Sequence, residues 1–464
     1  MSKVNIDSLV AENYNRVFAS SIDIEITKPC EIQNGIIEIN EKDRINYAKI
    51  FDDTRTKVKL FIPASGSGSR MFEFLYDEYG NCKENDTLVS SFFSSIESMA
   101  IWHVIPEKIK LSFRENGKFQ TLLNYLISES ELNYRLLPKG LFPFHKYKDL
   151  VLNPFQEHVI QGLQLGVNLK GIHFTIQSNF QAIINSSINN VLNLDKSFPI
   201  EFSEQNSNTD AVVFLSDGQV ATNNYGHILR RPSGHGALLS NLSRLDDDFI
   251  LIKNIDNVQH QTKAQDTILY WKFLCGLLME IKTKAKAIFN SPSLQDLKHF
   301  NDAYQIYHDE EINSIKNNDG VRSLLNRPFR VCGMVKNEGQ PGGGPFWTRN
   351  QFGYSKQIVE RSQINNSVNQ IELFNKSTHF NPVMMVISMY DFTGKKFDLS
   401  KYSDDSSYII VNKSDAGKKI VFAELPGLWN GAMAKWNSTF VQISNKVFTP
   451  VKSVLDLLNE SHQE

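Results

Sequence analysis

A short apolar strand that runs directly into a glycine-rich loop is the feature that most constrains this chain. Residues 58–64 read Val-Lys-Leu-Phe-Ile-Pro-Ala, and Ser-Gly-Ser-Gly-Ser-Arg follows at 65–70. A strand this apolar is typical of the buried part of a sheet. Gly66 and Gly68 accept backbone conformations that other residues avoid, so successive N–H groups can turn toward one anion, and Arg70 adds a forked cation. The stretch predicts a phosphate-binding loop at the end of a strand.

Two better-known phosphate motifs do not fit this loop. A Walker loop ends in Gly-Lys-Ser/Thr, and the dinucleotide fingerprint requires glycine where Met71 stands. A helix beginning near Met71 would add about 0.3–1 kcal/mol of attraction for an anion. Taken alone, the loop is as compatible with an ordinary tight turn as with a phosphate site.

Composition narrows the class of ligand and the cellular setting. The 464 residues are 41% hydrophobic, enough for one large domain with appendages or for two domains. A formal net charge of −2 gives no field that gathers nucleic acid or an anionic membrane, so a small ligand is favoured. The first residues lack the apolar core of a signal peptide, and Lys272 interrupts the most apolar run, so we expect a cytoplasmic protein. Four cysteines without a Cys-x-x-Cys pair argue against zinc and against a disulfide scaffold.

The order of apolar and polar stretches predicts an α/β protein. Strand-like and helix-like stretches alternate after residue 154, which indicates a sheet with helices on both faces. We expect residues 1–56 to form an N-terminal helical appendage and 57–330 a catalytic core. Within that core, 72–137 has helical periodicity and is expected to be an insertion. Residues 331–464 are expected to form a separate C-terminal part.

Three further motifs are candidates for ligand contacts. Pro138 and Gly140 pin a turn that presents Lys139, a point cation suited to a triphosphate, although a surface lysine would look the same. Gln205 follows a predicted strand and can read a base edge through its amide, or simply mark the strand end. The Gly234-His235-Gly236 loop lets a flat ligand approach the backbone. His235 is either a ligand contact or general acid, or a structural histidine.

Two charged residues complete the set of candidates. Asp256 follows the apolar strand 249–255, and one aspartate with phosphate oxygens and waters is a common way to hold Mg²⁺. The rival acidic cluster at 246–248 precedes that strand and is expected at the opposite sheet edge, as a solvated turn. Lys452 follows Pro450 and can supply a further cation, unless it is only a lysine at a helix start.

In this order, the motifs resemble those of the UDP-sugar pyrophosphorylases, a family of sugar nucleotidyltransferases. The corresponding stretches are residues 66–71, 138–140, 204–205, 234–238, 254–257 and 448–458. The resemblance covers the body of the chain and implies a Rossmann-like mixed sheet of the GT-A nucleotidyltransferase type. Ser69 stands where the family has threonine, and residues 72–137 separate two elements that lie close together in the family. The chain therefore resembles a bacterial offshoot of these enzymes.

The resemblance also implies that residues 331–464 complete the sugar-phosphate site, and it implies roles for the candidate residues. Arg70, Lys139 and Lys452 would be the catalytic cations, and Asp256 would hold Mg²⁺. The implied nucleotide-binding residues are Gly66, Ser67, Gly68, Ser69, Gln205, Gly234, His235 and Gly236.

The implied reaction joins a sugar 1-phosphate to a nucleoside triphosphate, with UTP as the expected nucleotide, and releases pyrophosphate. Two other functions stay open: a GT-A-like glycosyltransferase that uses a nucleotide sugar, and a non-catalytic protein that senses a nucleotide or sugar phosphate. We expect alanine at Lys139 or Asp256 to abolish turnover without changing the melting profile, and alanine at Asp247 to be nearly silent.

Overall fold

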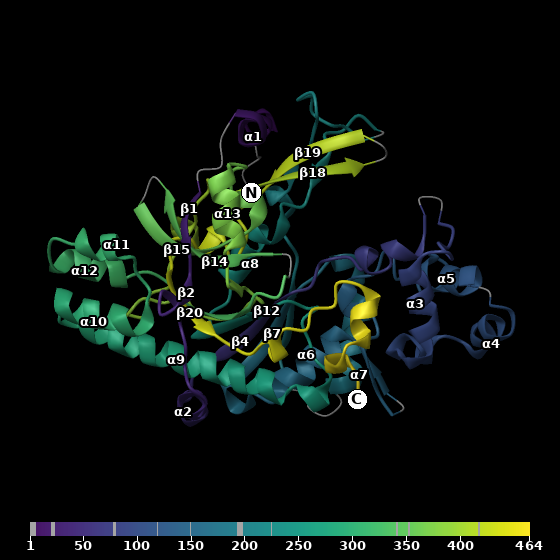
Figure 1. Cartoon of the computed structure of the whole chain (residues 1–464), viewed down its shortest axis with the longest axis horizontal. Helices are drawn as coiled ribbons and strands as arrows, with labels where there is room; N and C mark the ends of the chain where they lie inside the picture. Colours follow the sequence, from purple (N-terminus) through teal and green to yellow (C-terminus); the bar gives the residue numbers. More distant parts are fainter. Residues whose placement is uncertain are drawn as a thin grey trace. The chain divides into compact units, whose positions relative to one another are not determined.

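The chain folds into two compact units, each assembled from three separate stretches (Figure 1). The computed structural model describes residues 6–19, 24–77, 80–117, 119–148, 150–192, 198–223, 225–339, 342–350, 353–415 and 418–464. The first unit consists of Met1–Val58, Gln205–Ile252 and Trp271–Ser444, and the second of Lys59–Glu204, Lys253–Tyr270 and Asn445–Glu464. The division into residues 1–56, 57–330 and 331–464 that the sequence led us to expect stays a prediction. The two compact units have other boundaries and do not test it.

A mixed sheet forms the centre of the first unit, with the strand order β2-β3-β20-β13-β17-β12 and with β16 beside β13. Its strands are β2 (Glu31–Ile32), β3 (Gly35–Ile37), β12 (Phe249–Lys253), β13 (Phe329–Lys336), β16 (His379–Phe380), β17 (Met384–Ser388) and β20 (Asn437–Gln442). β13 runs parallel to β20 and antiparallel to β17. Every residue of β17, and all but the last of β13, is buried. The sheet is therefore covered on both faces, as the alternation of strands and helices predicted.

Smaller sheets and a set of helices complete the first unit. One sheet has the order β1-β14-β15, a second β10-β19-β18, and a third pairs β11 with β9. These strands are β1 (Glu25–Pro29), β9 (Ala211–Val212), β10 (Phe214–Leu215), β11 (Arg230–Arg231), β14 (Gly344–Asn350), β15 (Gly353–Val359), β18 (Ile409–Asp415) and β19 (Lys418–Glu424). The helices are α1 (Ile6–Tyr14), α2 (Glu41–Asp53), α8 (Leu239–Leu242), α9 (Gln265–Asn290), α10 (Leu294–Tyr304), α11 (Asp309–Asn313), α12 (Asn318–Leu325) and α13 (Val368–Asn375), and most of α9 belongs to this unit. None of the helices in the described residues has the length and apolarity needed to cross a membrane.

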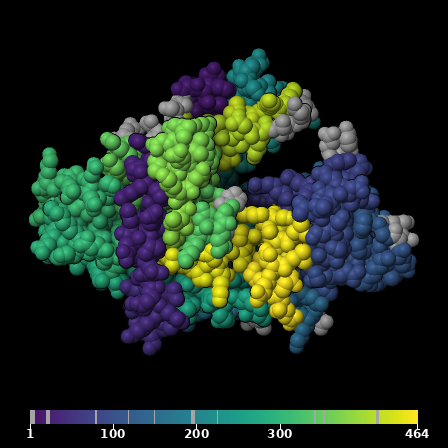
Figure 2. All heavy atoms as spheres, in the orientation of Figure 1, coloured from purple at the N-terminus to yellow at the C-terminus, as the bar shows by residue number. Residues whose placement is uncertain are grey.

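The N-terminal residues are not only helical, so the expected helical appendage is wrong for part of 1–56. β1 pairs antiparallel with β14, and β3 pairs parallel with β20, so both belong to sheets of the first unit. Ile24 and Ile26 are buried while Glu25 between them is exposed, which is the two-residue period of a half-buried strand. The helical interpretation missed this period. Figure 2 shows the result as a purple band of N-terminal residues lying against the green surface of the same unit.

The second unit is built on three strands in the order β4-β7-β8. They are β4 (Val58–Pro63), β7 (Leu169–Thr175) and β8 (Ile200–Ser203), and β5 (His145–Tyr147) forms a separate hairpin with β6 (Leu150–Leu152). β7 and β8 run parallel. The helices are α3 (Thr87–Ser95), α4 (Glu107–Asn116), α5 (Phe119–Ile127), α6 (Pro154–Leu163) and α7 (Gln181–Leu192). The predicted strand at 58–64 thus exists as β4, and its apolar side chains are buried except for the partly buried Pro63.

One large hydrophobic core in the second unit ties the helical segment to two of the sequence motifs. The helical segment is residues 72–137, which include α3, α4 and α5. Phe92 of α3 and Leu123 of α5 share this core with Met71, at the end of the glycine-rich loop, and with Val454, just after Lys452. In Figure 2 the yellow C-terminal residues accordingly lie against the blue helical segment. The helical segment therefore supports both chain segments that carry candidate cations.

Candidate active site

The glycine-rich loop and the Pro-Lys-Gly turn are joined by backbone hydrogen bonds. The N–H of Gly68 donates to the carbonyl of Leu137 at 2.9 Å, and the N–H of Lys139 donates to the carbonyl of Gly66 at 3.0 Å. Ser67 and Pro138 form the β-bridge between these two bonds. Two motifs separated by the helical segment therefore lie side by side, and the backbone of Lys139 is hydrogen-bonded to the glycine-rich loop.

The loop itself is open on one side and packed on the other. A Cβ atom added at Gly66 would meet nothing within 4 Å, whereas one at Gly68 would lie 3.1 Å from the carbonyl oxygen of Tyr134. The hydroxyls of Ser67 and Ser69 lie 3.1 Å apart. Gly66 thus leaves room for a ligand to approach the backbone, while a side chain at Gly68 would be tight against the backbone of residues 134–137.

Arg70 lies just after this loop, on the exposed side of a short 3₁₀ helix, η2 (Ser69–Met71). A second 3₁₀ helix, η3 (Glu73–Leu75), follows, so no longer helix begins near Met71. The extra anion attraction expected from a helix dipole therefore has no basis here. The buried side chains of Met71 and Leu75 instead bind this segment to the core.

Lys139, Asp256 and Lys452 form a compact charged cluster. Both Nζ atoms lie 3.0 Å from the same oxygen, Oδ2 of Asp256. Lys139 also donates to the carbonyl of Val451 at 2.6 Å. The side chains of Lys139 and Asp256 are only 14% and 9% exposed, whereas that of Lys452 is 63% exposed. The sequence predicted all three residues as site residues, and the structure brings them together.

The electrostatics of the cluster follow from this burial. Burial alone would raise the pKa of Asp256, but the ammonium groups of Lys139 and Lys452 outweigh it and hold that pKa below its ordinary value. Burial lowers the pKa of Lys139; the carboxylate of Asp256 opposes this, and the charges of Lys452 and Arg70 add to it. Two ammonium groups thus converge on one carboxylate, with the charge of Arg70 acting on Lys139, and the surplus is positive charge that an anionic ligand would neutralise.

Local contacts fix Asp256 just beyond the end of β12. The N–H of Val451 donates to the Asp256 carbonyl at 3.0 Å, and the adjacent Asn257 forms a β-bridge with Pro450. On the other side, His158 donates from Nε2 to the Ile255 carbonyl at 3.1 Å. The carboxylate and the segment carrying Lys452 are therefore positioned by the same backbone contacts.

A metal ion at this cluster would have a single protein carboxylate to use. In the chain as described, no group of three or more His, Cys, Asp or Glu side chains is arranged to hold a metal ion. Mg²⁺ in phosphate-transfer sites commonly takes one or two carboxylates and fills its other positions with phosphate oxygens and water. Asp256 fits a metal of this kind, which arrives together with a phosphate ligand.

The rival acidic cluster makes other contacts. Asp248 accepts the backbone N–H of Lys57 at 2.9 Å, and Asp246 pairs with Lys396 at 2.8 Å. Both contacts lie before the first residue of β12, at the end of the strand opposite to Asp256.

Gln205 and the Gly234 loop lie together in the first unit. Gln205 donates from Nε2 to Asp210 at 3.4 Å, and the Ser233 hydroxyl donates to the carbonyl of Thr209. Gly234 has a φ of +65°, which favours glycine. A Cβ at Gly236 would lie 2.1 Å from the carbonyl oxygen of Pro426, so this glycine is required by chain packing alone.

His235 is held by its own packing contacts. Its ring stacks on Trp429 with centroids 4.0 Å apart, and its Nδ1 accepts the backbone N–H of Leu428 at 2.8 Å. Burial lowers its pKa to about 4, so the ring is neutral at physiological pH. A neutral ring whose Nδ1 is already engaged agrees with the structural alternative for this histidine and leaves only Nε2 for a ligand.

Comparison with known proteins places the chain in a family. Residues 2–463 match the model of the family described as "Domain of unknown function (DUF4301)". The chain belongs to this family. Among curated proteins, nothing matches the DUF4301 chain.

Several solved structures are remotely similar to the DUF4301 chain. A protein of Entamoeba histolytica assigned as a UDP-N-acetylglucosamine pyrophosphorylase is 12% identical, with a TM-score of 0.48 over 92% of this chain and 84% of the other. A mutant form of UDP-glucose pyrophosphorylase from Leishmania major, in complex with UDP-glucose, is 12% identical, with a TM-score of 0.44 over 97% and 73%. A UDP-glucose phosphorylase from Trypanosoma brucei is 11% identical, with a TM-score of 0.46 over 98% and 75%.

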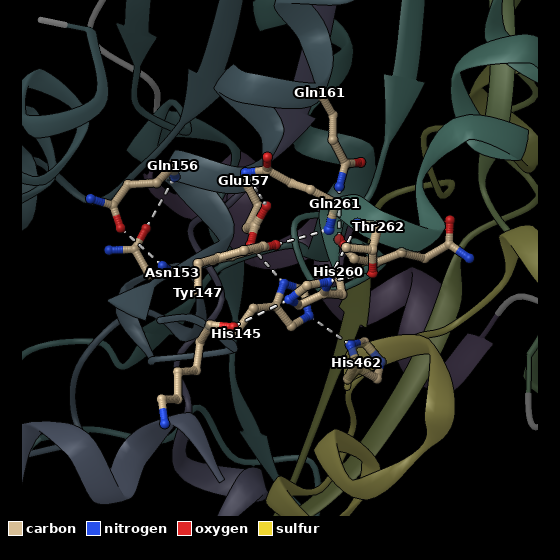
Figure 3. A network of polar contacts seen from close by, with 12 residues as sticks. His145, Tyr147, Asn153, Gln156, Glu157, Gln161, His260, Gln261, Thr262 and His462 are labelled. Carbon is tan, nitrogen blue, oxygen red and sulfur yellow. Dashed lines mark hydrogen bonds and ion pairs between the residues drawn. The ribbon is translucent and has the colours of Figure 1, made fainter. Parts of the chain in front are cut away.

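The DUF4301 chain also contains a buried histidine network that the sequence interpretation missed (Figure 3). Nδ1 of His145 lies 2.7 Å from Glu157, and its Nε2 lies 2.9 Å from Nδ1 of His462. His462 in turn donates from Nε2 to the carbonyl of Thr449 at 3.1 Å. The Tyr147 hydroxyl donates to Glu157 at 2.7 Å.

This network fixes the C-terminal segment of the DUF4301 chain near Lys452. Thr449, which His462 holds, lies three residues before Lys452. His260 stacks on Tyr147 with ring centroids 4.2 Å apart and so braces the same network. No local spacing signals such a set, since His145 and His462 are 317 residues apart.

Proposed function

We propose that the protein is a sugar-phosphate nucleotidyltransferase. It would join a sugar 1-phosphate to a nucleoside triphosphate, with UTP as the expected nucleotide, and release pyrophosphate. The observation that carries the proposal is the sharing of one buried carboxylate oxygen by Lys139 and Lys452, beside a glycine-rich loop that ends in Arg70. The resemblance of the motifs supplies the class of reaction, and we propose on the same ground that the sheet is of the GT-A nucleotidyltransferase type.

The proposed chemistry requires no general base. An oxygen of the sugar phosphate forms the new bond to the α-phosphorus, and the bond from that phosphorus to the β-phosphate oxygen breaks. The electron pair of the broken bond leaves with pyrophosphate. Because the attacking phosphate is already an anion at neutral pH, the protein contributes alignment and charge stabilisation.

Each residue of the cluster has a distinct part in this proposal. The backbone around Gly66 and the guanidinium of Arg70 bind the triphosphate, and Lys139 stabilises the charge that develops on the transferred phosphoryl group. Lys452, the more exposed of the two lysines, binds the sugar phosphate. Asp256 holds both ammonium groups in place before the anions enter.

We further propose that Mg²⁺ enters with the triphosphate and is held by Asp256. When bound, the metal neutralises phosphate charge and polarises the phosphoryl oxygens. Oδ2 of Asp256 accepts both lysines, so Asp256 serves the metal only if the lysines transfer part of their contacts to the phosphates.

The proposal is tested by measuring the pyrophosphate that the purified full chain releases from nucleoside triphosphates. UTP, ATP, GTP, CTP and dTTP are each supplied with Mg²⁺ and a panel of sugar 1-phosphates. We expect release that depends on both one triphosphate and one sugar phosphate. The melting temperature of the protein is measured with the same ligands. A rise only with UDP or with an intact nucleotide sugar would favour a glycosyltransferase. A rise with nucleotides, without turnover on any sugar 1-phosphate, would favour the sensor.

A matched pair of variants tests the site itself. Lys452→Gln should lower kcat/KM by roughly 10²–10³-fold, the usual loss for one preorganised charge contact in the transition state. Lys263→Gln is the control, because Lys263 is an exposed lysine of the same unit outside the cluster. Equal activity of the two variants would remove Lys452 from the site.

A further inference from the structure

The buried histidine network of the second unit contains a carboxylate whose charge is balanced only by a histidine. The side chains of Glu157 and His145 are both 0% exposed, and within the described residues the ion pairs of Glu157 involve His145 alone. The other donors to this carboxylate are neutral, namely the Tyr147 hydroxyl at 2.7 Å and Nε2 of Gln261 at 3.3 Å. Because an uncompensated buried carboxylate is costly, a positive charge on the His145 ring would stabilise it.

The contacts along this network fix the number of protons in it. Figure 3 shows Glu157, His145 and His462 joined in a row. The Thr449 carbonyl can only accept, so Nε2 of His462 carries a proton. Nδ1 of His462 lies 2.9 Å from Nε2 of His145, and one proton must lie between them, because two lone pairs would repel each other. The 2.7 Å contact between His145 and Glu157 requires another. The network thus needs three protons, one more than a carboxylate and two neutral rings carry.

The surroundings place the additional proton on His145. Burial, together with the charge of His145, lowers the pKa of His462 to about 3, so that ring is neutral and accepts at Nδ1. The hydrogen bonds from Tyr147 and Gln261 favour the ionised form of Glu157. His145 is then a buried imidazolium that donates to both neighbours, and the network as a whole has no net charge.

The neighbouring His260 needs no additional proton. Its Nε2 donates to the Lys146 carbonyl at 3.2 Å, and its Nδ1 accepts from the Thr262 hydroxyl at 2.7 Å. Burial lowers the pKa of His260, and the charge of His145 adds to this effect, while the charge of Glu464 opposes it. A neutral ring therefore satisfies both contacts, so His260 is an internal comparison for His145.

The network reaches the proposed catalytic cluster through one backbone position. Thr449 is held on one side by His462, and on the other by Asn257, whose side-chain oxygen accepts the Thr449 N–H at 3.0 Å. Lys452 lies three residues further along the chain. Without the additional proton, two lone pairs would face each other at the contact between the rings, and His462 would no longer be held against Thr449.

We propose that the network of Glu157, His145 and His462 holds one buried proton in excess of a carboxylate and two neutral rings. This proton makes His462 a positioning residue for Lys452. His462 acts through the backbone of Thr449 and contacts no substrate. The part of the inference that concerns Lys452 rests on the proposed function, whereas the proton itself does not.

Nitrogen-15 NMR of the full chain with labelled histidine, at pH 8, tests the proton. An exposed histidine is charged in only about 3% of molecules at this pH. We expect one ring with both nitrogens protonated, and a coupling across a hydrogen bond from one of them to a second ring. Both signals should vanish in His145→Gln and persist in His103→Gln, which replaces an exposed histidine of the same unit. A wild-type spectrum with every histidine neutral, or a charged ring that survives His145→Gln, overturns the proposal.

Hydrogen exchange and steady-state kinetics test the positioning role. His462→Phe removes the donor to Thr449, so amide exchange at Thr449 and Val451 should become about tenfold faster, the size of one lost hydrogen bond. The KM for the sugar 1-phosphate should rise by a similar factor, with the KM for the triphosphate unchanged. His462→Gln should restore both values, because its amide can accept from His145 and donate to Thr449.

Two results would overturn the positioning role of His462. One is amide exchange that is no faster in His462→Phe than in His462→Gln, and the other is an equal rise of both KM values. A merely structural role would lower the melting temperature without separating the two substrates. The spectrum and the exchange rates need no turnover, so failure here is distinct from failure of the proposed reaction.

Discussion

Replacing Asp256 by asparagine removes the charge that Lys139 and Lys452 share while keeping the shape of the side chain. The sequence alone led us to expect that losing this residue would leave the melting profile unchanged. The structure changes that expectation, because Asp256 is 9% exposed and its partner Lys139 14%. Without the carboxylate, a buried ammonium group keeps only the Val451 carbonyl. Such an uncompensated buried charge costs about 3–5 kcal/mol.

The same cluster provides an internal comparison. Lys452 is 63% exposed, so its ion pair with Asp256 is screened by solvent and contributes about 0–1 kcal/mol to stability. We therefore expect Asp256→Asn to destabilise the second unit by about 3 kcal/mol, or ~6–12 °C in melting temperature for a unit of 150–250 residues. Lys452→Gln should change stability by less than about 1 kcal/mol, although both variants lose turnover.

The assay is urea unfolding of wild type and both variants, followed by circular dichroism, with pyrophosphate release measured on the same preparations. A loss of stability in Asp256→Asn that is no larger than in Lys452→Gln would refute the reasoning, because it would mean that the carboxylate does not compensate Lys139. The double variant provides a check, since residues that share one oxygen should give non-additive effects.

Three further outcomes follow from the structure. Gly66→Ala should fold normally, because its Cβ meets nothing within 4 Å, and should weaken triphosphate binding. Gly140→Ala should lower the melting temperature, because its Cβ would lie 2.5 Å from the ring of Phe155. Equal melting temperatures for the two variants would contradict this. Burial lowers the pKa of His158 from 6.5 to about 3, so the unfolded chain takes up a proton below pH 6.5 that the folded chain refuses. The contribution of His158 to stability is complete above pH 6.5 and is lost as the pH falls toward 3, by about 2 kcal/mol at pH 5; His158→Gln, which keeps a donor, should flatten the dependence of urea midpoints on pH between 7 and 5. Asp247→Ala should leave kcat/KM within about twofold of wild type, and a large loss would place the metal at the other edge of the sheet.

Local signals in the sequence were sufficient where the chain itself fixes a residue. The strand 58–64 is apolar except for Lys59, Lys139 is held between Pro138 and Gly140, and Asp256 follows a buried strand, so each was recognised without its partners. The core of the fold and the three charged residues of the cluster could be predicted for this reason.

Contacts between distant residues could not be predicted. That Lys139 and Lys452 share one oxygen of Asp256 depends on contacts across 117 and 196 residues, for which no local pattern exists. The glycine at 236 was interpreted as room for a ligand, but the chain around Pro426 occupies that space. β1 is stabilised largely by pairing with β14, more than 300 residues away, so its short alternating pattern was assigned to the wrong element.

The discontinuous second unit has a consequence for the synthesis of the protein. Lys139 and the Val451 carbonyl that it contacts are separated by 312 residues. At about 5–20 residues per second, a ribosome needs roughly 15–60 s to add that length. Throughout this interval the nascent chain carries Lys139 without the segment that completes its surroundings, and part of the core shared with Val454 is exposed. We therefore expect newly made chains to be prone to aggregation until the last stretch docks.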